Sequence, residues 1–244
     1  MDVSINGPKI IFTLPVFGGI NITESVVHAW LVMALIVGAC LWLTKDLSVQ
    51  NPGKKQIIAE KLVLMVRGLV DGNMGSQWAH FVPYIGTLFA FSFVSSVLSV
   101  TGLRSPTADF SVTLAMALVT FVLIEYYYFK NKGFFGFFKR LTEPVIVMTP
   151  MNLVSEVATP LSLALRHFGN IASGAIITTL VYGALTALSK FVLGWIPNTF
   201  IASIPIMQIG LPAVLSIYFD LFSSAIQAYI FVMLTMANIA GTAD

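Results

Sequence analysis

The sequence contains little charge. Only 10% of its 244 residues are Asp, Glu, Lys or Arg, whereas 57% are hydrophobic, and the mean hydropathy is +0.88. A soluble domain of this size carries about 25% charged residues. The composition therefore excludes an ordinary soluble domain and predicts an all-α integral membrane protein.

Several groups that mark other classes of protein are scarce or missing. The single cysteine, Cys40, lies in an apolar run, which excludes a disulfide framework and a cysteine metal cluster. The three histidines are far apart, and there is no Walker loop, GxGxxG motif or Gly-x-Ser-x-Gly elbow. The 13 basic residues are dispersed, with a net charge of +2, which does not suggest nucleic-acid binding. We expect no metal, no cofactor and no cleavable signal peptide.

Charge-free runs divide the chain into membrane segments. Residues 1–24 are mixed and polar, and we expect them outside the membrane. The last two apolar segments contain about 40 residues each, roughly twice what a perpendicular crossing needs, so they must tilt, bend or break. The predicted segments are crossings at 25–45, 80–102, 109–130, 151–189 and 201–240, an amphipathic surface helix at 54–71 and a cytoplasmic aromatic, basic connector at 133–150.

Basic residues predict the orientation of the chain. Nine of them fall on loops of one side of the membrane, and Lys9, Arg104 and Lys190 fall on the other. This asymmetry predicts an external N-terminus, a cytoplasmic C-terminus and five crossings. The two halves show no internal repeat, which argues against an inverted-repeat transporter.

One acid, Glu125, lies near the end of the third crossing, among tyrosines and just before Lys130 and Lys132. Tyrosines in this position are typical of a membrane interface. We favour a local pair with one of these lysines, or with lipid headgroups, over a role in transport.

A permanent positive charge, Arg166, lies inside an apolar segment. Between Glu156 and Lys190 the only other Asp, Glu, Lys, Arg or His is His167. Arginine stays protonated in poor solvents, and an arginine inside a membrane costs roughly 3 kcal/mol, so it is a functional candidate. The alternative is an arginine that reaches the headgroups from a helix end. Polar residues at helical spacing place a stripe on the same face: Thr159, Ser162, Arg166, Asn170 and Ser173.

The last segment carries a second polar stripe around Asp220, which is the only charged residue between Lys190 and Asp244. An acid this deep pairs, coordinates an ion or is protonated. Both a hydrated ion path and a structural salt bridge with Arg166 remain open, and Glu156 fits either a buried acid or an interfacial one. The other members of this stripe are Ser216, Ser223, Ser224, Gln227 and, three turns farther on, Asn238.

Several motifs occur in an order that resembles one family, subunit a of the F-type ATP synthase. They are Pro160-Leu-Ser-Leu-Ala-Leu-Arg166 followed by Phe168-Gly-Asn170, the loop Pro106-Thr-Ala-Asp109, and Ile226-Gln227-Ala-Tyr-Ile-Phe in the last segment. The chain differs from the family pattern at three positions. His167 replaces a bulky apolar residue, Ala175 replaces a glutamate, and Asp220 replaces a histidine of some members.

The resemblance implies rotary ion translocation, with the last two segments forming a tilted hairpin that faces the c-ring. Arg166 would separate two offset half-channels, with Asn170 at the centre. Asp220 and Gln227 would line the external path, and Glu156 the cytoplasmic exit. The small polar residues of both stripes and His167 would support these paths.

The implied partners are the c-ring, the peripheral-stalk dimer of subunit b, the remaining subunits of the complex and the lipid bilayer. The subunit itself would not be an enzyme, because ATP is made in the soluble sector. A bacterial plasma membrane is the expected location, with an organelle as the alternative. The choice between proton and sodium ion depends largely on the c-subunit, a different chain.

Two other functions remain open. A secondary transporter would bind an anionic substrate at Arg166 and couple it to a proton through Asp220. A purely structural membrane subunit would need the arginine only for assembly.

Overall fold

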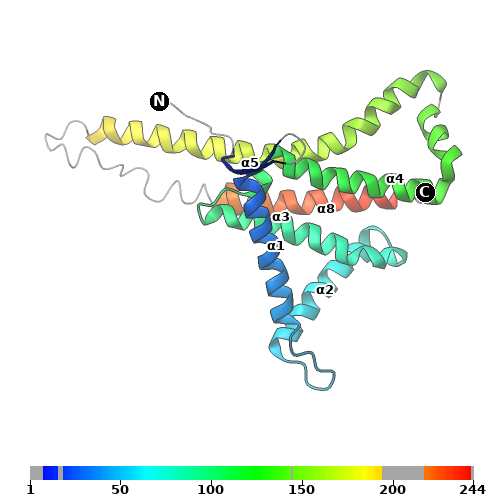
Figure 1. Cartoon of the computed structure of the whole chain (residues 1–244), viewed down its shortest axis with the longest axis horizontal. Helices are drawn as coiled ribbons and strands as arrows, with labels where there is room; N and C mark the ends of the chain where they lie inside the picture. Colours follow the sequence, from blue (N-terminus) through cyan, green and yellow to red (C-terminus); the bar gives the residue numbers. More distant parts are fainter. Residues whose placement is uncertain (1–7, 16–18, 144, 194–216, 243–244) are drawn as a thin grey trace.

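A computed structural model describes residues 8–15, 19–143, 145–193 and 217–242, and its long elements are all helices (Figure 1). Within these residues, five helices are long and apolar enough to cross a membrane. The prediction of an all-α membrane protein with five long apolar helices is confirmed. The α-helices are α1 (Glu24–Leu43), α2 (Lys54–Asn73), α3 (Val82–Val100), α4 (Phe110–Thr142), α5 (Thr149–Leu193) and α8 (Ser224–Ala240).

Short elements connect these helices. The antiparallel strands β1 (Ile10–Leu14) and β2 (Ile20–Thr23) precede α1, a hairpin that the sequence pattern did not predict. Gly19, just before β2, has a φ of 99°, a positive value that glycine adopts without the steric cost that other residues meet. The remaining short elements are the 3-10 helices η1 (Ser76–Phe81), η2 (Pro106–Ala108) and η3 (Ile146–Met148), and the π-helix η5 (Ile217–Ser223).

The core lies where α3, α4, α5 and α8 pack together. Two small residues, Ala117 on α4 and Ala164 on α5, are fully buried, and larger side chains such as Ile85 and Phe231 fill the space between the helices. Small residues let neighbouring helices approach closely. In Figure 1, the axes of α3, α4 and α8 are roughly parallel, with α3 running opposite to the other two, whereas α1 crosses them.

The helix that carries Arg166 is the longest element. α5 has 45 residues, which corresponds to about 68 Å at 1.5 Å per residue, and it contains Pro160. The other long segment, predicted at 201–240 near the end of the chain, is described only from residue 217, as η5 followed by α8. Its first part, including Ser216, lies outside the described residues.

The amphipathic helix α2 keeps its apolar side chains exposed. Ile58, Leu62 and Met65 are about half exposed, while Val70, near the end of the helix, is buried in the core. Apolar side chains exposed along one helix are typical of helices that lie in the surface of a membrane.

The last part of α4, which overlaps the predicted connector, contains a sharp bend. The chain continues as helix to Thr142, but Gly133, with φ 71° and ψ 178°, interrupts the helical geometry. This left-handed conformation is readily adopted only by glycine. The bend brings the last part of α4 back toward residues near position 125, and this places the charged cluster described below.

The bend gives a first prediction. Gly133→Ala should lower the stability of the protein by about 1–2 kcal/mol, because an L side chain is strained at positive φ. The matched control is Gly38→Ala on α1, where an added Cβ meets no atom within 4 Å and helix propensity should raise stability by about 0.5–1 kcal/mol. Thermal unfolding in detergent measures both changes. Equal stability of the two variants would show that the bend at Gly133 is not required.

Candidate ion-translocation site

The side chain of Arg166 is exposed on α5. The ion pairs within the described part of the chain do not include it. The next residue, His167, is completely buried. Two neighbouring residues of one helix therefore have opposite surroundings, and the guanidinium lies on a face of α5 that the described residues leave uncovered.

The polar stripe predicted around Arg166 divides between surface and interior. Ser162 and Ser173 are exposed, whereas Thr159 and Asn170 are half-buried. The hydroxyl of Thr159 donates to the Ser155 carbonyl oxygen at 2.9 Å, and that of Ser173 to the Asn170 carbonyl oxygen at 3.1 Å. Such bonds satisfy hydroxyl groups within their own helix.

One pair of residues joins the two predicted stripes. The Asn170 amide donates to the Ser223 carbonyl oxygen at 3.2 Å, and the Ser223 hydroxyl donates to Asn170 Oδ1 at 2.9 Å. These reciprocal bonds hold α5 against the end of η5. The contact therefore lies at a π-helical turn, a feature that occurs frequently at functional sites.

The remaining residues of the second stripe follow along the last helix. The backbone of Asp220 lies in η5, while its side chain is not among the groups described. Ser224 and Gln227 are buried, and the amide nitrogen of Gln227 has no partner among the described residues. A possible salt bridge between Arg166 and Asp220 therefore stays a prediction.

His167 is held between two other helices. Its Nε2 lies 3.0 Å from the Ser92 hydroxyl on α3, and its ring packs against Phe231 on α8 with centroids 5.4 Å apart. Ser92 is fully buried. The sequence pattern did not single out the serines of α3, because a serine in an apolar run can satisfy its hydroxyl within its own helix.

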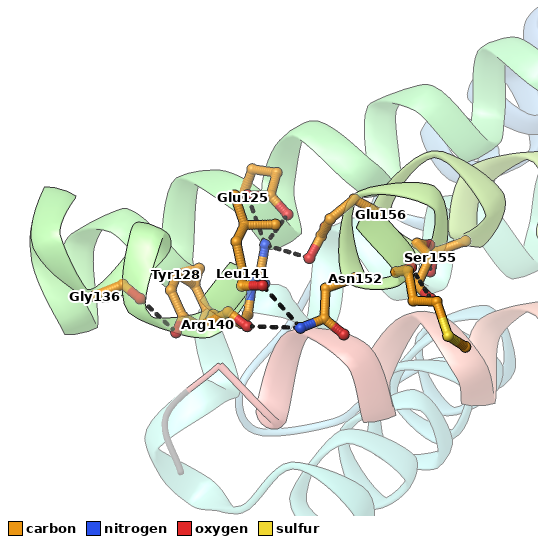
Figure 2. Close-up of polar contacts among 10 residues, drawn as sticks. Glu125, Tyr128, Gly136, Arg140, Leu141, Asn152, Ser155 and Glu156 are labelled. Atoms are coloured by element: carbon orange, nitrogen blue, oxygen red, sulfur yellow. Dashed lines mark hydrogen bonds and ion pairs between the residues drawn. The ribbon is translucent and has the colours of Figure 1, made fainter. Parts of the chain in front are cut away.

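A second cluster of polar side chains lies where α4 and α5 connect. Figure 2 shows Arg140 between two acids. Its terminal nitrogen donates to Glu125 at 2.9 and 3.2 Å and to Glu156 at 2.7 Å. The three side chains are only 16–26% exposed. We call these three residues the acid–arginine cluster. Two carboxylates share one guanidinium, so the cluster has a formal charge of −1 when both are ionised.

Aromatic and amide groups position the arginine. Its guanidinium carbon lies 4.0 Å from the ring centroid of Tyr128, a favourable cation–π geometry. The Asn152 amide donates to the carbonyl oxygen of Leu141 at 2.9 Å (Figure 2) and to that of Glu143 at 2.8 Å. These bonds fix the end of α4, which carries Arg140, to the start of α5.

The partner of Glu125 differs from the one that we expected. The sequence suggested Lys130, Lys132 or lipid headgroups, whereas the ion pair is with Arg140, fifteen residues farther along. The bend at Gly133 brings this residue back across the turn. A glycine between two charged helical stretches was the one signal in the sequence that pointed to such a reversal.

A pocket of about 220 Å³ lies beside the acid–arginine cluster. Three predicted site residues, Glu156, Thr159 and Asn238, line it together with Glu125 and Arg140. The structure thus brings residues of both predicted stripes together at this end of the bundle. It separates them from the Asn170–Ser223 contact, which lies about three to four helical turns farther along α5.

Comparison with known proteins decides the family. The model of the family described as ATP synthase A chain matches residues 26–240. The chain belongs to this ATP synthase subunit a family. It is accordingly a multi-pass membrane protein, and the resemblance inferred from the motifs is confirmed.

Relatives of the subunit a family align over nearly the whole chain. "ATP synthase subunit a, sodium ion specific" of Propionigenium modestum is 32% identical, with 98% of this chain and 86% of the relative covered. "ATP synthase subunit a" of Staphylococcus saprophyticus is 33% identical, with 96% and 91% covered. "ATP synthase subunit a 1" of Hahella chejuensis is 33% identical, with 92% and 86% covered. All three organisms are bacteria.

Proposed function

We propose that the chain is the ion-translocating stator subunit of a rotary ATP synthase in a bacterial plasma membrane, with its N-terminus outside and its C-terminus in the cytoplasm. In this role it provides two offset half-channels to a c-ring, and Arg166 separates them. The subunit itself performs no ATP chemistry. Its other contacts are with the subunit b dimer of the peripheral stalk and with the rest of the complex.

The exposed guanidinium of Arg166 carries the proposal. An arginine that only stabilised the fold would be buried and paired within the chain, because a buried charge without a partner is strongly unfavourable. Here the side chain is exposed, and the apolar residues beside it, Leu161 and Leu165, are 42% and 49% exposed. A positive charge in an apolar surface suits a partner that brings a carboxylate and otherwise apolar helices, which is the chemistry of a c-ring.

Arg166 would act on the carboxylate of each passing c-subunit. The fixed positive charge stabilises the ionised form of that carboxylate where the dielectric constant is low. It also repels a cation that would pass directly from one half-channel to the other. The carboxylate therefore passes Arg166 as an anion, and its ion is taken up on one side and released on the other.

The remaining residues divide into two paths. Asp220 and Gln227 line the external path, and Asn170 supports the centre through its bonds with Ser223. The pocket beside Glu156 is the cytoplasmic exit, and the shared guanidinium of Arg140 holds the acid at its edge.

A complementation experiment tests the proposal. The chain is expressed in a bacterium that lacks its own subunit a, together with the other subunits from the source of the chain. Everted membrane vesicles should then acidify when ATP is added, or accumulate sodium ions if the ring takes sodium. Vesicles from cells that carry the empty vector are the control. Uptake of an organic anion by the purified chain alone, with no ATP-driven ion movement in the vesicles, would instead support a secondary transporter.

A further inference from the structure

Buried polar atoms without a partner gather around His167. The described residues offer no hydrogen-bond partner to His167 Nδ1, the Ser95 and Thr235 hydroxyls or the Gln227 amide nitrogen. All four side chains are at least nine-tenths buried. Together with Ser92, we call these residues the buried polar cluster.

Helix geometry places the cluster in one region. Ser92 bonds to His167, and Ser95 lies one turn farther along α3 on the same face. Phe231 packs against the imidazole ring, and Gln227 and Thr235 lie one turn before and after it on α8. Three helices therefore direct polar groups toward the space around one imidazole.

Unpartnered polar atoms of this kind are expected to bind ordered water. Buried polar atoms in proteins are nearly always hydrogen-bonded, to protein or to ordered water. A buried water needs two to four polar partners, and the cluster has four unpartnered atoms. The apolar residue usual at position 167 in the family cannot offer any, so the histidine adds a polar group that the family pattern lacks at this position.

The Ser92 bond leaves one ring nitrogen free. In the tautomer with its hydrogen on Nε2, the imidazole donates to the Ser92 hydroxyl oxygen, and the lone pair of Nδ1 is available as a base. The titratable or charged residues on α3, η5 and α8, which pack around His167, are Tyr84, Tyr218, Asp220 and Tyr229; those on its own helix are Glu156, Arg166, Tyr182 and Lys190. None of the ion pairs among the described residues includes the histidine.

We propose that His167 carries protons through the external half-channel between water molecules held by the buried polar cluster. A hydronium ion on one side gives its proton to Nδ1: one O–H bond breaks, one N–H bond forms, and a water molecule remains. The imidazolium then returns this proton to the next water, which restores the neutral ring. The proposal rests on the function proposed above and makes it specific for protons, because an imidazole cannot carry a sodium ion in this way.

Passive proton conduction tests this role. Vesicles that contain the assembled complex are stripped of the soluble sector, and proton flux is followed under an imposed potential. His167→Leu and His167→Gln should each lower the flux about a hundredfold, the smaller end of what a positioned proton-transfer group contributes. Gln keeps a hydrogen bond to Ser92 but has no titratable nitrogen. The matched control is His80→Gln, an exposed histidine on η1 that contacts Tyr127.

Each outcome decides between a relay and another role. Parental flux in His167→Leu would overturn the proposal and leave the histidine a packing residue. Parental flux in His167→Gln, with loss in His167→Leu, would also overturn it, because a hydrogen bond alone would then suffice. Should the Leu variant fail to assemble, the Gln variant decides. Flux of sodium ions in place of protons through the parent complex would overturn the proposal as well.

A second measurement tests the water in the cluster directly. Ser95→Cys is introduced after the exposed Cys40 has been replaced by serine. Silver ions, which travel through water and bind thiolates, should then block proton flux. Val97→Cys, at a position of α3 that is 37% exposed, is the control and should be insensitive. Insensitivity of Ser95→Cys would overturn the hydrated relay.

The outcomes also separate this proposal from the proposed function. Normal ATP-driven pumping by an Arg166→Ala complex would disprove the stator function itself. Loss of pumping in Arg166→Ala together with parental flux in both His167 variants would disprove the relay alone.

Discussion

Vesicles that carry Arg166→Ala should show no ATP-driven acidification although the complex assembles completely. Each elementary charge that crosses 100 mV represents about 2.3 kcal/mol, and this energy drives rotation only when the ion cannot pass directly between the half-channels. In the proposed function, alanine removes the charge that would prevent direct passage and would stabilise the ionised c-ring carboxylate. Quenching of a pH-sensitive dye measures pumping, and co-purification of all subunits measures assembly.

Two further variants control this result. Arg166→Lys keeps the charge but loses the planar guanidinium, and we expect it to retain only a small part of the activity. Arg67→Ala removes an arginine that is 60% exposed and pairs with Asp71 at 3.5 Å on α2; it should pump normally. Normal pumping by Arg166→Ala would return the arginine to a structural role or to the binding of an anionic substrate.

Arg140→Gln should lower the stability and the amount of the protein in the membrane. The change leaves Glu125 and Glu156 close together without the cation that they share. Hydrogen bonds to charged groups contribute about 1.5–3 kcal/mol each, and we expect about 2 kcal/mol in total because the cluster is partly exposed. Thermal unfolding in detergent measures the loss.

The neighbouring residue provides the control. Lys139→Gln breaks an ion pair with Glu143 in which both side chains are mostly exposed, so stability should change by less than about 0.5 kcal/mol. Removing one carboxylate as well, in Glu125→Gln combined with Arg140→Gln, should restore part of the loss, because the like-charge contact is then relieved. A similar effect of Lys139→Gln and Arg140→Gln would indicate that the acid–arginine cluster contributes no more than a surface pair.

The sequence predicted the features that depend on local spacing. An arginine among apolar residues, a polar stripe at helical intervals and motifs in a fixed order are all visible in the chain itself, and they identified α5 as the principal helix. Asn170 and Ser223 were each predicted from their own stripe, and the structure brings them into contact.

The features that depend on distant residues were not predictable. The pairing of Glu125 with Arg140 follows from one left-handed residue, Gly133, and helical periodicity carries no information about the direction of the chain after such a bend. The inward orientation of His167 depends on Ser92 and Phe231, which belong to helices far away in the sequence. A helical wheel assigns a residue to a face, but only packing decides which face is covered.

The contacts along α5 have a mechanical consequence. A stator that faces a rotating ring must withstand a sideways load on the surface that the ring passes, and a free helix of about 68 Å would bend under it. Beyond the Asn152 bonds at its start, polar contacts hold α5 at three further points: to Arg140 through Glu156, to Ser92 through His167, and to Ser223 through Asn170. These three attachments lie eleven residues and then three residues apart, with Arg166 between the outer two. We therefore expect that weakening one attachment increases slip, that is, ATP consumed per ion moved, before it affects assembly.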